Sequence, residues 1–376
     1  LMSDEIKKGL VGVISDETKV SKVMPEINSL TYRGYAVQDL AEECSFEEVA
    51  YLLLYGELPN KKQLKKFEKE ERKNRDISKN LIKIIKNYPK KSHPMDTTRT
   101  SISVMGLEDP ETSDNSEKAN YRKAIRLLAK ISTAVAANFR IRKGKKIIKP
   151  NKKLSFSENF FHMCFGKVPS KEVVKAFDVS MILYAEHSFN ASTFTSRVIT
   201  SSLSDMHGAV TGAVASLKGP LHGGANEAVM HMLKEVKKPE NAEKWILDKI
   251  KNKGLLMGFG HRVYKNGDSR VPTMKKYYLK TAEFYKNKKY PAISQILEDT
   301  MIKEKNIHPN LDFPAGPTYY LMGFDIDFFT PIFVASRITG WTAHVMEQFS
   351  DNRLIRPLSA YTGSEHRKVQ NIKDRK

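Results

Sequence analysis

Residues 255–272 read LLMGFGHRVYKNGDSRVP and bring several kinds of binding group together. Gly258 and Gly260 allow unusual backbone angles and leave N–H and C=O groups open to a ligand. His261 can donate or accept a hydrogen bond near neutral pH, and the guanidinium of Arg270 can grip a carboxylate through two bonds. No third glycine stands where a GxGxxG motif needs it, since that position is Val263, and no GK[ST] follows. Spacing alone therefore leaves a solvated glycine turn and a binding loop as equally good interpretations.

The bulk composition is that of a soluble globular protein. The chain has 376 residues, of which 40% are hydrophobic. This length suffices for two or three domains, or for one large domain with a smaller one set into it. No apolar run approaches the roughly 18 residues that span a bilayer. Cys44 and Cys164 lie far apart, which favours free thiols in a reducing compartment. We therefore expect a cytoplasmic protein without a membrane partner.

The formal net charge of +20 raises the alternative of a basic nucleic-acid-binding protein. Much of this charge lies in residues 60–91, where acidic residues are interspersed among the lysines and leucine and isoleucine recur at helical spacing. Such segments are typical of solvated helix faces. The chain carries no helix-turn-helix, zinc-finger, RRM or KH signature. We expect no nucleic-acid partner, and the sequence offers no other reason for most of the positive charge.

The patterning predicts a mainly α fold. Residues 11–37 are rich in Val, Ile, Thr and Tyr and are interrupted by Gly and Pro. This pattern predicts a few short strands. Ser45 and Glu48 form a capping box before an apolar segment that Gly56 ends. From there helical periodicity continues almost to the C-terminus, interrupted by prolines.

Two charged residues stand alone in apolar surroundings. Asp312 is the only Asp, Glu, Lys or Arg between Lys305 and Asp325, and Arg337 is the only one in residues 328–346. A carboxylate in apolar company is a stronger base, because desolvation disfavours its charged form. A buried arginine needs a carboxylate or an anionic ligand. Asp312 in a simple turn is the alternative, and its apolar setting favours function.

Two histidines lie where a ligand could approach. His187 stands beside a run of small residues that leaves room for one. His222 lies in LHGGANEAV, flanked by glycines and just before a predicted helix. The positive end of a helix dipole disfavours an imidazolium, so we expect His222 to be a neutral donor. A helix cap is the alternative. Arg356, near the C-terminus and ahead of a proline, taken alone is a surface charge.

Together these residues predict a carbon–carbon bond-forming condensation. An aspartate base with a neutral histidine donor suits removal of a proton next to a carbonyl, since the donor stabilises the enolate oxygen. Several arginines suggest an anionic substrate, such as a dicarboxylate. An alternative is a non-haem metal enzyme, with His222, His261 and Asp312 as a two-histidine, one-carboxylate site. It leaves the arginines less well explained.

The chain resembles the citrate synthase family over residues 10–363. The resemblance is carried, in order and at matching separations, by LHGGANEAV, GFGHRVYKNGDSR, PNLDFPAG, SRITGWTAHVMEQ and IRPLSAYTG. It implies a mostly helical homodimer with shared active sites. It also implies a large domain of residues 1–222 and 318–376, and a small coenzyme-A-binding domain of residues 223–317 that closes over the substrates.

The resemblance also implies a role for each site residue. His222 bonds to the thioester carbonyl, Asp312 abstracts the proton, and His261 donates to the oxaloacetate carbonyl. The residues matching the oxaloacetate ligands are His187, Arg270, Arg337 and, across the dimer interface, Arg356. The backbone of Leu256, Met257, Gly258, Phe259 and Gly260 would recognise adenine, with Arg262 and Lys265 or Lys305 near the phosphates. No metal or redox cofactor is implied, because acyl-CoA is a substrate.

The amino-acid sequences of several segments are most similar to those of the 2-methylcitrate synthase branch. These segments include MILYAEHSFNASTF and FPAGPTYYLMGFDID. Members of that branch condense propionyl-CoA with oxaloacetate to 2-methylcitrate and CoA, and usually accept acetyl-CoA as well. The alternative is citrate synthase proper, which uses acetyl-CoA. One methyl group in an apolar pocket supplies only about 1–3 kcal/mol of discrimination.

Overall fold

The computed structural model describes residues 6–261, 263–264 and 266–375. The strands are β1 (Ser21–Met24), β2 (Ser29–Tyr32) and β3 (Tyr35–Ala36). The first helices are α1 (Val37–Glu43), α2 (Phe46–Tyr55), α3 (Lys61–Lys73), α4 (Lys79–Asn87), α5 (Pro94–Glu108), α6 (Glu117–Arg142), α7 (Phe156–Phe165) and α8 (Lys171–Tyr184). The later ones are α9 (Ala191–Ser201), α10 (Met206–Leu217), α11 (Ala225–Val236), α12 (Pro239–Lys251), α13 (Val271–Phe284), α14 (Lys289–Lys305), α15 (Asp312–Leu321) and α16 (Phe329–Ser350). Short 3-10 turns are η1 (Lys8–Leu10), η2 (Pro25–Ile27), η3 (Ile326–Phe328) and η4 (Ile372–Asp374).

The predicted N-terminal strands form one small antiparallel sheet in the order β1-β2-β3. Lys22 of β1 pairs with Thr31 of β2, which pairs in turn with Ala36 of β3. Tyr32 is fully buried, and its hydroxyl donates to the carbonyl oxygen of Ile182 at 3.0 Å. The sheet is thereby fastened to the end of α8, where the chain turns towards the candidate site.

Local sequence signals account for many helix ends. The capping box predicted at Ser45 and Glu48 is present at the start of α2, and Gly56 ends that helix with φ 88°. Asn60 with Gln63 and Ser155 with Glu158 form further capping boxes on α3 and α7. The predicted mainly α fold is confirmed.

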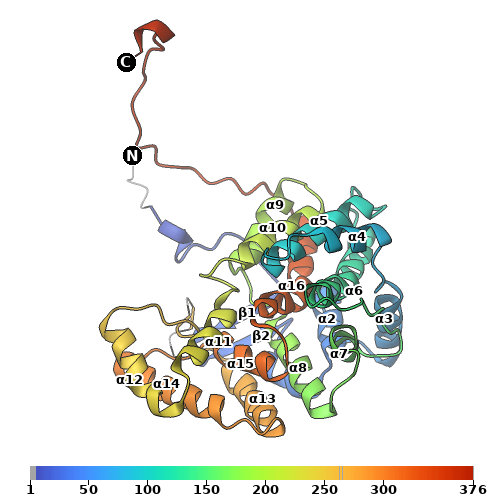
Figure 1. Ribbon diagram of the computed structural model, residues 1–376. Coiled ribbons are helices and arrows are strands. Elements are labelled where there is room, and N and C mark those ends of the chain that lie inside the picture. The colour runs from blue at the N-terminus through green and yellow to red at the C-terminus, as the bar shows by residue number, and fades with distance from the viewer. Residues whose placement is uncertain (1–5, 262, 265, 376) are drawn as a thin grey trace.

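Helix α16 lies at the centre of the larger part of the molecule. It packs against α2, α6, α8, α9 and α10 (Figure 1). Its residues are buried over most of its length, and Trp341 is fully buried. Among the described residues, no helix is both long and apolar enough to cross a membrane.

Helices α11 to α15 form a second group beside this body, at the lower left of Figure 1. Within the group α12 packs on α14, and α15 packs on both α11 and α13. The group meets the body where α13 contacts α8 and where α11 contacts α16. The candidate site lies along this junction.

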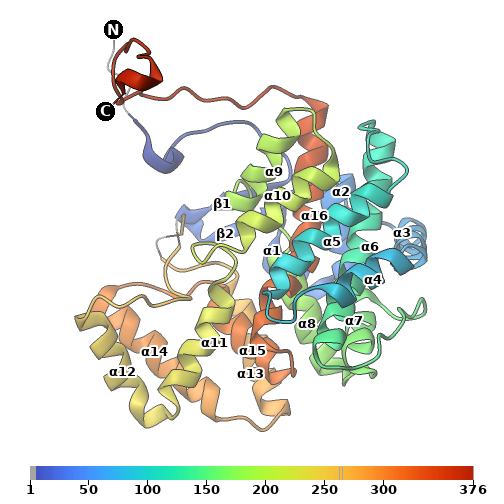
Figure 2. The ribbon, with the colours of Figure 1, turned by 45° about the horizontal axis from the view of Figure 1, so that its top comes forward.

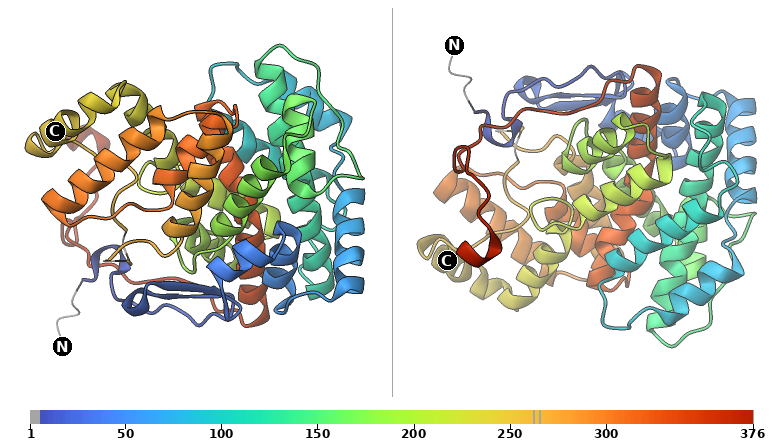
Figure 3. Two further views of the ribbon diagram at one scale, coloured as in Figure 1. Left: turned by 90° about the horizontal axis from the view of Figure 1, so that it is seen from below. Right: turned by 90° about the horizontal axis from the view of Figure 1, so that it is seen from above.

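The C-terminal segment after α16 leaves the body as an extended chain (Figures 2 and 3). The N-terminal segment leaves on the same side in Figure 2. Large apolar side chains of the C-terminal segment are exposed to solvent: Leu354, Leu358, Tyr361, Val369 and Ile372.

A substitution at Gly340 tests how tightly α16 is packed. A Cβ added there would lie 2.4 Å from both the carbonyl oxygen of Ala185 and a carboxylate oxygen of Glu186. We expect Gly340→Ala to lower the free energy of unfolding by about 1–3 kcal/mol through overpacking. This loss would occur although alanine is intrinsically the better helix former by about 1 kcal/mol. Denaturant unfolding measures the change.

The matched control is Gly208→Ala in the first turn of α10. The methyl added there meets only the ends of the Asp205 and Ser204 side chains, at 3.3 Å. We expect no loss of stability in this variant. Equal effects of the two substitutions would contradict the close approach at Gly340.

Candidate active site

A cavity of about 1390 Å³ opens at the junction of the α11–α15 group with the body. The predicted catalytic and anion-binding residues that line it are His187, His222, His261, Arg270, Asp312 and Arg337. The predicted coenzyme-binding residues that line it are Leu256, Met257, Gly258, Phe259 and Gly260. These residues are spread over positions 187 to 337 of the chain, and the fold brings them to one place.

The glycine loop is fastened by its backbone to the segment that precedes Asp312. Gly260 N donates to the carbonyl oxygen of His308 at 2.8 Å, and Asn310 N donates to that of Gly258 at 2.9 Å. The Asn310 amide group adds a bond to the carbonyl oxygen of Gly260 at 2.9 Å. Gly258 and Gly260 both have positive φ, at 81° and 77°, as their predicted role requires.

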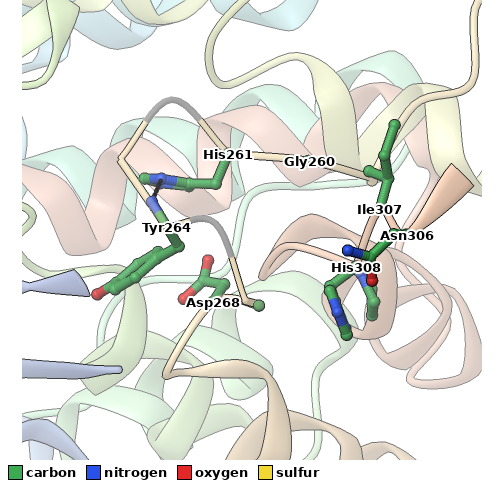
Figure 4. Close-up of a pocket in the computed structure, with 9 residues that line it drawn as sticks. Gly260, His261, Tyr264, Asp268, Asn306, Ile307 and His308 are labelled. Atoms are coloured by element: carbon green, nitrogen blue, oxygen red, sulfur yellow. Dashed lines mark hydrogen bonds between the residues drawn. The ribbon is translucent and has the colours of Figure 1, made fainter. Parts of the chain in front are cut away.

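His261 stands between two cavities. Besides the large one, it lines a smaller cavity of about 250 Å³, together with Asp268 and His308 (Figure 4). The backbone N–H groups of Val263 and Tyr264 donate to His261 Nδ1 at 3.0 and 3.2 Å. Since Nδ1 accepts, the ring proton lies on Nε2. His261 can therefore act as an Nε2–H donor.

Asp312 is the first residue of α15 and has the properties of a general base. Burial raises its pKa to about 6, although a hydrogen bond from Tyr184 opposes the shift. The Tyr184 hydroxyl donates to Asp312 Oδ1 at 2.6 Å. A carboxylate with a pKa near 6 is still ionised at neutral pH and is a stronger base than an ordinary aspartate.

His222 lies in the turn before α11 and is kept neutral. Burial lowers its pKa to about 3, and the positive charge of Arg337 adds to the effect. The shift has the predicted direction, but its main cause is burial and not the predicted helix dipole. The Ser192 N–H points at Nε2 at 3.3 Å and the Ser192 hydroxyl oxygen lies 2.8 Å from it. Because a backbone N–H can only donate, Nε2 accepts and the proton lies on Nδ1.

A cationic pocket surrounds His187. Arg270 and Arg337 are 6% and 1% exposed. Two oxygens of Asp268 bind Arg270, at 3.0 Å from Nε and 2.7 Å from Nη2. Arg337 Nε donates to the carbonyl oxygen of Tyr184 at 2.6 Å. Burial lowers the pKa of Arg337 to about 10, against the opposing effect of the Glu186 carboxylate.

His187 itself is 7% exposed, and its Nε2 has no hydrogen-bond partner among the described residues. Burial, followed by the charge of Arg270, holds its pKa well below the usual range. A buried polar atom without a partner is uncommon in native structures. Its position on the cavity wall beside two arginines suits an anionic ligand.

Sequence reasoning missed the residues that orient these groups. Tyr184 bonds to the candidate base, and Ser192 bonds to His222. Trp341 Nε1 donates to the Ser192 hydroxyl at 3.1 Å, and Asp268 holds Arg270. Asp268 could have been found from its place two residues before Arg270. The other three lie too far from their partners in the chain for a local signal.

Four predicted residues are not placed on the cavity wall. Arg356 and Lys305 are exposed and lie outside the residues that line it. Arg262 and Lys265 fall outside the described residues. Over the described ranges, no three His, Cys, Asp or Glu side chains are grouped so that they could hold a metal ion.

Comparisons of this chain with known proteins all point to the same family. The family model described as citrate synthase, C-terminal domain, matches residues 9–358. The chain is 55% identical to a 2-methylcitrate synthase of Mycobacterium tuberculosis, over 96% of this chain and 92% of that one. It is 54% identical to a citrate synthase of Mycolicibacterium smegmatis, over 97% of each chain.

Among solved structures, the fold matches citrate synthase of Thermoplasma acidophilum in ternary complex with carboxymethyl coenzyme A and oxaloacetate. The TM-score is 0.94 at 34% identity, covering 99% of this chain and 100% of that one. Sequence, fold and the residues gathered in the cavity therefore agree: this chain belongs to the citrate synthase family.

Proposed function

We propose that the protein is a 2-methylcitrate synthase, which condenses propionyl-CoA with oxaloacetate to 2-methylcitrate and CoA and also accepts acetyl-CoA. The observation that carries the proposal is one cavity lined by a base with a raised pKa, a neutral histidine donor and two buried arginines. The 55% identity to a 2-methylcitrate synthase of Mycobacterium tuberculosis supports the propionyl branch.

The first step is removal of a proton from the carbon next to the thioester. Asp312 takes this proton, while the Nδ1–H of His222 donates to the thioester oxygen as negative charge develops on it. A histidine whose pKa is about 3 donates a hydrogen bond without first being protonated. Ser192 fixes the orientation of that donor.

The enolate then attacks the ketone carbon of oxaloacetate. We assign the Nε2–H of His261 to the ketone oxygen, which gains negative charge as the new bond forms. His187, Arg270 and Arg337 would hold the carboxylates of oxaloacetate, since charged hydrogen bonds are strong where water is excluded. Water then hydrolyses the thioester, which releases CoA and the free acid.

Coenzyme A would lie along the glycine loop. We propose that the backbone of residues 256–260 recognises its adenine, and that Arg262 with Lys265 or Lys305 lies near its phosphates. The exposed position of Lys305 is compatible with a contact to a phosphate. No metal or redox cofactor is needed for this chemistry.

We further propose a homodimer in which residues 223–317 form a small domain that closes on a large domain of residues 1–222 and 318–376. The exposed apolar residues of the C-terminal segment support an arm that packs on a second copy. Such an arm would carry Arg356 into the partner's cavity. A cytoplasmic location stays a prediction, supported by the free thiols of Cys44 and Cys164.

The acyl-CoA preference tests the proposed function. With oxaloacetate saturating, we expect CoA release with a higher kcat/KM for propionyl-CoA than for acetyl-CoA. One methyl group limits the ratio to about 10–200-fold. A preference for acetyl-CoA would make the protein a citrate synthase, the second candidate, which the relative from Mycolicibacterium smegmatis favours. No CoA release with either would refute both.

The pH dependence reports the candidate base. Asp312 works only when deprotonated, so kcat/KM for the acyl-CoA is expected to fall as the pH drops through about 6. His222, with a pKa of about 3, stays neutral over this range. Removing the hydroxyl in Tyr184→Phe takes away a bond that stabilises the carboxylate, so this limb moves to higher pH. Initial rates in buffers of constant ionic strength measure the shift.

Tyr319→Phe is the control for this measurement. Tyr319 is also buried and lies close to Tyr184, but its hydroxyl bonds to Ser180 at 2.9 Å. We expect the acid limb to stay in place in this variant. If the acid limb of the pH profile does not move in Tyr184→Phe, the assigned hydrogen bond does not influence the pKa of Asp312.

A shared active site predicts complementation between inactive variants. Asp312→Asn lacks the base, and Arg356→Ala lacks the proposed cross-subunit ligand, so each homodimer is expected to lose nearly all activity. A heterodimer of the two has one intact site, because base and arginine come from opposite subunits. Purified heterodimers are expected to show about half the wild-type kcat per dimer, and inactive heterodimers would contradict a shared site.

A further inference from the structure

The helix that follows His222 begins without a side-chain cap of its own. The residue before α11 is Gly224, which has no side chain that could cap the helix. Helix ends with exposed N–H groups need partners or a carboxylate nearby. Gly223 presses against α10, since a Cβ there would lie 2.5 Å from the Leu217 side chain. The position of this end of α11 sets the position of His222.

A carboxylate in the first turn of α11 ties this end to two helices of the body. Glu227 Oε1 accepts a bond from the Thr330 hydroxyl and a second from Thr330 N, at 3.3 Å. Glu227 Oε2 lies 3.0 Å from His93 Nε2. Thr330 is in the first turn of α16, and His93 is the residue before α5. Both oxygens of Glu227 are therefore occupied by groups outside the α11–α15 group.

The histidine is oriented for this contact. Met95 N donates to His93 Nδ1 at 3.1 Å, so Nε2 carries the ring proton and donates to Glu227. The Glu227 side chain is 15% exposed, which makes these hydrogen bonds stronger than surface contacts. The neighbouring Arg142 is engaged elsewhere, because it pairs with Asp327 at 3.1 Å.

His222 is thus held from two sides. Ser192 at the start of α9 fixes its ring, and Glu227 fixes the helix that carries its backbone. On α11 the other face of the same turn is also tightly packed: a Cβ on Gly316 of α15 would lie 2.5 Å from the carbonyl oxygen of Asn226. If the Glu227 contacts were lost, the turn and the Nδ1–H donor would shift relative to Ser192.

We infer that Glu227, through His93 and Thr330, is a positioning residue for the proton-abstraction step, because it sets the place of the His222 donor. The inference rests on the proposed condensation. Donor placement matters most where charge develops, and an error of about 1 Å in such a group can lower the rate by about a hundredfold. The carboxylates of oxaloacetate are assigned to His187, which follows α8, to Arg270, which precedes α13, and to Arg337 of α16. We therefore expect oxaloacetate binding not to depend on the Glu227 contacts.

The test compares Glu227→Ala with wild type in steady-state kinetics with propionyl-CoA and propionyl-CoA deuterated at C2. We expect kcat to fall about tenfold or more, with oxaloacetate affinity in the absence of acyl-CoA changed less than about twofold. The deuterium isotope effect on kcat is expected to rise, because enolisation becomes the slow step. A variant that is merely less stable would lose active protein without any change in the isotope effect.

Glu235→Ala is the matched control. Glu235 lies on the same helix, but it binds Trp245 Nε1 at 3.0 Å and Lys249 within the α11–α15 group. We expect wild-type kcat and isotope effect in this variant. His93→Asn is the milder second variant, because asparagine keeps a good helix cap while its shorter side chain withdraws the donor from Glu227. It is expected to change both quantities in the same direction by less.

Each outcome is decisive. If Glu227→Ala or, should that variant not fold, His93→Asn keeps the wild-type kcat and isotope effect, the positioning role is refuted and the proposed function stands. A lower kcat with an unchanged isotope effect and weakened oxaloacetate binding would also refute it, in favour of a structural role. A wild-type enzyme that releases no CoA would refute the proposed function and, with it, this inference.

Discussion

The burial of one guanidinium inside α16 constrains much of the structure around it. Arg337 is 1% exposed, and a buried charge is strongly unfavourable without compensation. The fold supplies the carbonyl oxygen of Tyr184 as an acceptor and the nearby charge of Glu186, which is itself fully buried. Glu186 is bound in turn by Ser21 of β1 and His344 of α16. The sheet, the end of α8 and the central helix thus meet around one positive charge.

Burial shifts the pKa values of Asp312 and His222 in opposite directions, and each shift suits the task of its group. Burial disfavours whichever form of a group is charged, so it raises the pKa of Asp312 and lowers that of His222. The first shift makes a better base, and the second keeps a hydrogen-bond donor neutral. The charge of Arg337 adds to the second shift and opposes the first, though in both it is less than the effect of burial.

Local signals in the sequence predicted the fold class and pointed to six residues that line the cavity: His187, His222, His261, Arg270, Asp312 and Arg337. Asp312 and Arg337 stood out as lone charges, and the capping box at Ser45 fixed the start of α2. The partners of these site residues could not be found in this way. Tyr184 and Asp312 lie 128 positions apart, and Ser192 and Trp341 lie 149 apart. Such pairs come together only through packing, which periodicity and caps do not encode.

The hydrogen bonds between the glycine loop and the segment before Asp312 limit how the sequence of this protein can vary. The bonds that join residues 258–260 to residues 308–310 are made mainly by backbone atoms. Side chains at several of these positions can therefore change without loss of the pairing, whereas an insertion or deletion in either segment shifts its register. Natural variation here is expected to respect length more strictly than residue type. The glycine loop, assigned to the coenzyme, and the segment that leads to the base Asp312 would then evolve together as one unit.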